Sequence, residues 1–158
     1  MDRNDFREYL GFLKALGDTL EDITRVEQEK TEFVRTDDLD GLNECMKREQ
    51  ALSLAMRAHD QKRETMLRTL GLEGVPLRSL MDYASAQDYE ETKRTVEQLC
   101  RQYALFRGAF EVARDTLECN LHQIEKMIQA EDPDAASSAG YPEASPELPP
   151  RMRTDFRA

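Results

Sequence analysis

Tryptophan is absent from this chain, and only three cysteines and two histidines occur among its 158 residues. Cys45, Cys100 and Cys119 are odd in number and widely spaced, which argues against a disulfide framework and suits a reducing compartment. With two histidines, no nucleophile-elbow motif and no glycine-rich phosphate loop, nothing supports acyl-transfer or nucleotide chemistry. The sequence therefore predicts a protein that is not an enzyme and binds no cofactor or metal.

Long apolar runs are also missing, and positive charge is in the minority. Hydrophobic residues make up 39% of the chain, charged residues 34%, and the net charge is −10. Phosphate backbones and anionic lipid surfaces would repel such a protein, so we expect no nucleic acid and no membrane insertion. The first residues carry acidic groups and no apolar signal region, so the expected location is cytoplasmic.

Glycine and proline are scarce before residue 131, which leaves room for long helices. The first should cover residues 4–36, roughly 50 Å at 1.5 Å per residue. Its apolar residues alternate by three and four, as in a coiled-coil seam, at Phe6, Tyr9, Leu13, Leu16, Leu20 and Ile23. Phe12, Val26 and Phe33 lie off this seam, so the buried face should be broader than a two-strand seam.

An acidic turn at residues 36–38 should cap a second helix that ends near Leu70, where Gly71 suits a left-handed C-cap. So short a connection makes the two helices an antiparallel hairpin. The inner face of the second helix is predicted at Leu39, Leu42, Cys45, Leu52, Met56, Met66 and Leu70.

A short linking helix is predicted from Leu77 to Tyr83, and a long last helix over residues 88–129. Its apolar stripe is Val96, Leu99, Tyr103, Phe106, Phe110, Ala113, Leu117, Leu121, Ile124 and Ile128. The predicted fold is therefore all-α: a coiled-coil-like helical bundle in one domain, residues 1–130. Residues 131–158 hold five of the six prolines and should be a disordered tail. Within this tail, Met152 and Phe156 lie among arginines and form a candidate docking element.

Two clusters test the non-enzymatic interpretation. His59, three residues before Lys62, resembles the accepting site of phosphotransfer bundles, but Arg63 stands where those domains usually carry a glycine. A boundary histidine on the second helix is the simpler interpretation. Cys119 and His122 are three residues apart, but no second cluster supplies the four ligands of a zinc site.

The apolar residues near the end of the last helix are the strongest candidate site. Leu117, Leu121, Ile124 and Ile128 extend toward the tail, where the other helices are expected to be too short to cover them. If they are uncovered, they form a groove-like surface for an amphipathic helix. The first helix or a second copy of the chain, in a homodimer, are the alternative covers, and the spacing alone leaves this open.

The layout resembles the FlgN family of flagellar type III export chaperones. The resemblance covers about Phe6 to Ile128 and lies in the order of several segments. These are Glu29-Lys30-Thr31-Glu32-Phe33, the acidic turn with Arg48-Glu49-Gln50 beyond it, Arg68-Thr69-Leu70-Gly71-Leu72 and Glu118-Cys119-Asn120-Leu121.

The resemblance implies a chaperone for hook-filament junction (hook-associated) proteins. It would cover the C-terminal amphipathic helix of its cargo, prevent premature assembly and deliver the cargo to the export apparatus. Asn120 and Leu121 match the last helix of the family, and Ile124 and Ile128 continue its apolar face. Without the resemblance, a generic coiled-coil adaptor or a phosphotransfer bundle using His59 are the alternatives.

Overall fold

The computed structural model describes residues 3–131, and within that range the chain is helical with no strand. Its elements are α1 (Arg3–Arg35), α2 (Leu39–Leu70), the 3₁₀ helix η1 (Leu77–Tyr83) and α3 (Tyr89–Glu131). The predicted all-α fold is confirmed, with the linking helix formed as 3₁₀. The predicted boundary at residue 130 falls at the end of the described residues. The predicted tail lies outside them, apart from Glu131.

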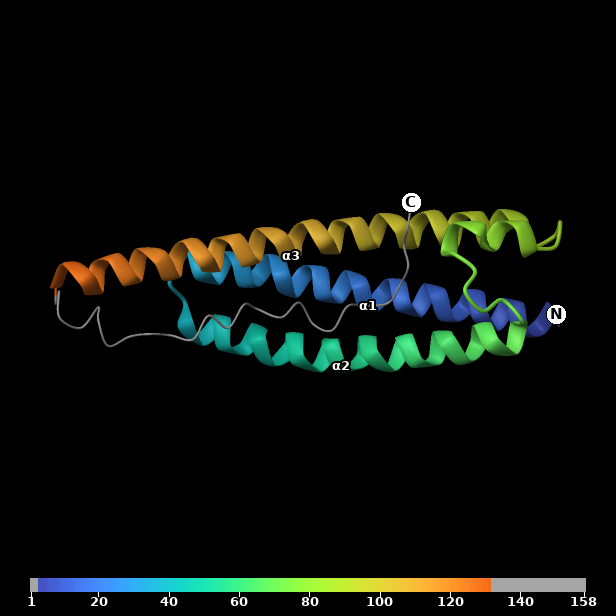
Figure 1. The fold of residues 1–158 in the computed structure, drawn as a ribbon, viewed down its shortest axis with the longest axis horizontal. Coiled ribbons are helices and arrows are strands. Elements are labelled where there is room, and N and C mark those ends of the chain that lie inside the picture. The colour runs from blue at the N-terminus through green and yellow to red at the C-terminus, as the bar shows by residue number, and fades with distance from the viewer. Residues whose placement is uncertain (1–2, 132–158) are drawn as a thin grey trace.

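The three long helices lie side by side, with α1 between the other two (Figure 1). α1 and α2 form the expected antiparallel hairpin, and α3 runs parallel to α1. α1 contacts both α2 and α3, whereas α2 and α3 do not contact each other within the described part of the chain. The last helix therefore packs on one member of the hairpin only.

This position between two neighbours explains why the buried face of α1 is broader than one seam. On one side, the Phe12 ring lies 5.6 Å from the His59 ring of α2, measured between centroids. On the other side, Gly17 packs closely under Gln102 of α3, whose amide donates a hydrogen bond to Glu21. Phe12 and Val26, both off the predicted seam, are buried as expected, and Phe33 is half-buried.

The ends of α2 are capped as the sequence predicts. The Asp38 carboxylate accepts a hydrogen bond from the Gly41 N–H, and Gly71 adopts φ 69° at the C-cap. Its inner face was predicted with two errors. Leu39 is 72% exposed, because it is the first residue of α2, at the hairpin turn. Leu67, absent from the predicted face, is buried.

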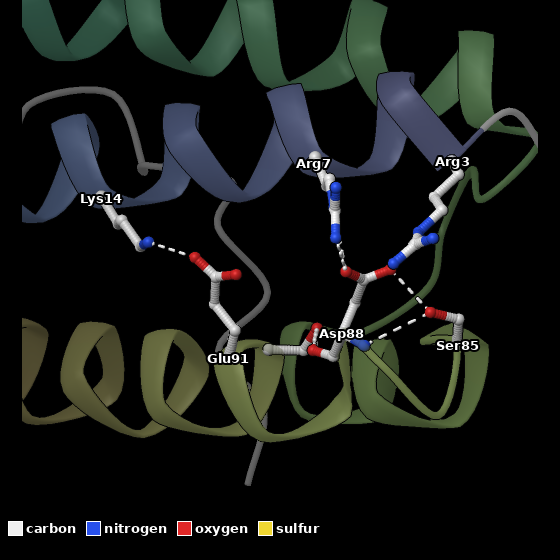
Figure 2. A network of polar contacts seen from close by, with 7 residues as sticks. Arg3, Arg7, Lys14, Ser85, Asp88 and Glu91 are labelled. Carbon is white, nitrogen blue, oxygen red and sulfur yellow. Dashed lines mark hydrogen bonds and ion pairs between the residues drawn. The ribbon is translucent and has the colours of Figure 1, made fainter.

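A buried carboxylate joins the N-terminal ends of α1 and α3 (Figure 2). Asp88 accepts hydrogen bonds from the Ser85 hydroxyl at 2.6 Å, Arg3 Nε at 3.1 Å and Arg7 Nε at 3.0 Å. Its backbone carbonyl accepts the first hydrogen bond of α3, from the Thr92 N–H. The hydrogen bond from Ser85, followed by those from the arginines, lowers the pKa of Asp88 to about 2.

We predict that Asp88→Asn lowers the thermal midpoint by several degrees at pH 7. The reason is that the amide cannot replace an ionised partner for Arg3 and Arg7. Because the folded-state pKa is depressed, the stabilisation is present above the unfolded pKa, 3.8, and is lost as the pH falls toward 2. Thermal unfolding followed by circular dichroism at pH 7 and pH 3 measures both effects.

The matched control is Asp18→Asn, which changes an exposed carboxylate on α1. An equal loss of stability in both variants would show that the Asp88 network has no special role.

A second buried charge cluster lies between α1 and α2. Glu27 is 1% exposed, and its Oε2 atom lies 2.8 Å from Lys30 Nζ, but neither carboxylate oxygen accepts a well-oriented hydrogen bond. Lys30 Nζ donates instead to Glu49 Oε2 of α2, at 2.9 Å. Burial raises the pKa of Glu27 to about 7, against the lowering effect of Lys30. This carboxylate therefore opposes folding when it is ionised.

We predict that Glu27→Gln gains roughly 1–3 kcal/mol of stability relative to the unchanged protein between pH 5 and pH 8, since only the unchanged protein must then bury an ionised group. Because the folded-state pKa of Glu27 is raised, its favourable contribution is complete below about 4.5 and is lost as the pH rises through about 7. The gain in the variant should accordingly shrink at pH 5. Urea unfolding at the two pH values tests this. Glu8→Gln, at an exposed position of α1, should change stability little at either pH.

Candidate protein-binding surface

The C-terminal part of α3 extends past the end of the α1–α2 hairpin (Figure 1). α1 ends at Arg35, and the last fully buried residue of α3 is Ala113. From Leu121 to Glu131 every residue is exposed. This end of α3 therefore has no cover within the described part of the chain.

The predicted site residues divide into two groups. Leu117 and Asn120 are half-buried at the level where α1 ends. Asn120 lines an open groove of about 430 Å³ there, together with Val34, Arg35 and Asp37. Beyond it Leu121 is 58%, Ile124 45% and Ile128 50% exposed.

One apolar residue of this surface was not predicted. Met127 is 69% exposed and lies seven residues after Asn120 and fourteen after Ala113. At this spacing the three residues share one side of the helix, and Ala113 on that side is fully buried. The side of α3 that is buried at Ala113 is thus uncovered at Met127. Extending the Ala113 position by two heptads could have identified Met127 from the sequence.

We call these five side chains the terminal apolar surface: Leu117, Leu121, Ile124, Met127 and Ile128. Their offsets of three, four and seven residues bring them to neighbouring positions on the helix. Leu117 is half-buried and the other four are exposed. A group of exposed large apolar side chains at neighbouring positions is typical of a surface that binds another protein. Charged residues accompany it in the sequence, among them Glu118, Glu125 and Lys126, as expected at the rim of such a surface.

The sequence offered two alternative chemical sites, the histidine His59 and the pair Cys119 and His122. His59 is half-buried, its Nε2 lies 3.1 Å from the Thr19 hydroxyl, and its ring packs on Phe12. It therefore holds α2 against α1, as a boundary histidine would. Around Cys119 and His122, and elsewhere in residues 3–131, no group of three or more potential metal-ligating side chains occurs. Met152 and Phe156, the predicted docking element of the tail, lie outside the described residues.

Residues 1–145 match the family described as FlgN protein. Since the match covers most of the chain, this protein belongs to the FlgN family, whose members are non-enzymatic flagellar export chaperones for hook-associated proteins. No curated protein and no solved structure matches the chain. Among the described helices, none is both long and apolar enough to cross a membrane.

Family membership confirms the predicted resemblance and favours the chaperone over the generic adaptor and the phosphotransfer bundle. It does not identify the residues that contact the cargo. The candidates for that role come from the geometry of α3.

Proposed function

We propose that the terminal apolar surface binds the C-terminal amphipathic helix of hook-associated proteins in the cytoplasm before export. The observation that carries this proposal is the uncovered end of α3. As far as Arg35, α1 packs along the side of α3 that contains Leu99 and Ala113, and beyond Arg35 that side is open. A cargo helix would continue the packing of α1 along α3.

The dimensions of the surface suit such a cargo. From Leu117 to Ile128 it covers about 17 Å, or three helical turns, at 1.5 Å per residue. An amphipathic helix with apolar residues at three- and four-residue spacing can place one row of side chains against it. Asn120, at the junction with α1, is positioned to hydrogen-bond with a polar group at one end of the bound helix.

This binding mode explains protection of the cargo. An apolar helix face that later mediates assembly would associate prematurely if it stayed in water. Coverage by Leu121, Ile124, Met127 and Ile128 removes that face from water until the chaperone dissociates. We also propose that the loaded chaperone delivers its cargo to the export apparatus, where its net charge of −10 favours basic docking elements.

We predict that Leu121→Asp, Ile124→Asp and Met127→Asp each weaken cargo binding by roughly tenfold or more. Burial of such a side chain is worth about 1.5–3 kcal/mol, and a charge cannot take its place. The measurement is calorimetric titration of the full-length protein with C-terminal fragments of hook-associated proteins from the same genome. Each variant should keep its helical circular dichroism, because these side chains have no cover within residues 3–131.

The matched control is Leu54→Asp, which changes a leucine of α2 that is 65% exposed and lies outside the surface. It should bind cargo like the unchanged protein. If all four variants bind equally well, the contacts lie elsewhere. If the well-folded unchanged protein shows no binding, the cargo assignment itself is wrong.

A further inference from the structure

A second apolar groove lies between α1 and α3, before the terminal apolar surface in the sequence. It has a volume of about 460 Å³ and is lined mainly by Leu105, Gly108 and Val112 of α3 and by Thr31, Glu32 and Arg35 of α1. Leu105 is 65% exposed and Val112 50% exposed, although both lie in the middle of the longest helix. Both side chains are this exposed with the rest of residues 3–131 in place, so nothing in the described part of the chain covers this groove.

Gly108 leaves the surface of α3 open to a close approach from outside the chain. A Cβ atom placed there would meet nothing within 4 Å, so no packing inside the protein requires glycine. Glycine is disfavoured in a helix interior, because the backbone loses more freedom and no side chain packs. Gly17 is the contrast, since a Cβ there would lie 2.2 Å from Gln102 Oε1. The close neighbour of Gly17 is within the chain, whereas at Gly108 the surface of α3 is open.

We propose that this groove is the contact between two copies of the chain, whose α3 helices cross antiparallel near Gly108. A two-fold contact requires a surface that is complementary to itself. Leu105 and Val112 lie three residues before and four residues after Gly108, so an antiparallel crossing brings Leu105 of one copy against Val112 of the other. The absence of a side chain at Gly108 lets the two backbones approach.

The charges around the groove show the same symmetry. Arg101 and Asp115 lie seven residues before and seven after Gly108, on the same side of the helix, and both are exposed. Arg101 has no ion-pair partner within residues 3–131, and Asp115 pairs only with the adjacent Arg114, at 3.4 Å. In the antiparallel crossing each Arg101 faces the second copy's Asp115, which gives two intermolecular ion pairs.

The C-terminal tail is the competing occupant, and the charges favour a second copy. The last eight residues hold three arginines, Arg151, Arg153 and Arg157, and a single carboxylate side chain, Asp155. This basic segment matches Asp115 and Glu32 better than it matches Arg101. A second copy satisfies the positive and the negative end of the groove at once. The proposal concerns a surface separate from the terminal apolar surface, so it stands or falls independently of cargo binding.

The first test is sedimentation equilibrium of the full-length protein over a wide concentration range, with a reductant so that exposed Cys119 forms no disulfide. We expect a reversible monomer–dimer equilibrium. Leu105→Asp should weaken the dimer by roughly tenfold or more, because it places a charge in the centre of the contact. Leu54→Asp, at an equally exposed leucine of α2, should leave the equilibrium unchanged.

The second test reverses the charges. Arg101→Asp and Asp115→Arg should each weaken the dimer, since like charges then face each other across the contact. The double variant should restore dimerisation, because the pairs reform with opposite sign. Restoration identifies the antiparallel register, which a general loss of surface charge would not reproduce. Leu105→Asp and Arg101→Asp should keep cargo affinity in the calorimetric titration.

Three results would overturn the proposal. One is a protein that remains monomeric at every concentration. Another is a dimer whose affinity falls no more in Leu105→Asp than in Leu54→Asp, or a double charge-reversal variant that does not recover dimerisation. The third is a full-length protein that dimerises only after Met152→Asp and Phe156→Asp are introduced together, which would identify the tail as the occupant of the groove.

Discussion

The burial of α1 on two sides is the constraint on which the rest of the structure depends. Within residues 3–131, α1 is the only long helix that contacts both others, through Phe12 and His59 on one side and Gly17 and Gln102 on the other. An ordinary three-helix bundle closes on itself, because each helix covers the other two. Here α2 and α3 stay apart, so α3 keeps one covered side and large exposed areas. The surfaces available for partners follow from this open arrangement.

The length of α1 then determines where α3 is covered. α3 has 43 residues and α1 has 33, and the two run parallel from the same end, where Asp88 binds Arg3 and Arg7. Because that network fixes the start of both helices, the difference in length appears entirely at the opposite end. The ion pairs near the N-terminus thus set the position of the terminal apolar surface, about 30 to 40 residues further along α3.

The sequence predicted the local structure well and the tertiary contacts only in part. The turn at Asp38, the cap at Gly71 and the helix limits follow from nearby residues, and all were predicted within a few positions. The burial of Leu67, the exposure of Leu39 and the absence of contact between α2 and α3 depend on which helix covers which face. A three-four spacing identifies an apolar face but not its neighbour. Met127 was missed because it lies beside the predicted stripe of Leu121, Ile124 and Ile128, and only the heptad spacing from Ala113 indicates it. The arginine partners of Asp88 lie more than 80 residues away and leave no local signal.

The overhang of α3 also implies a gradient of local stability along one continuous helix. Up to Ala113 its turns open only if contacts with α1 break, whereas beyond Asn120 the helix is held mainly by its own backbone hydrogen bonds. Isolated helical segments of this length are marginal in water, so the last three turns can unwind without disturbing the hairpin. Part of the binding energy of any partner on this segment would then be used to order it. Such a partner would be held specifically, yet could leave by a local transition rather than by unfolding of the whole protein.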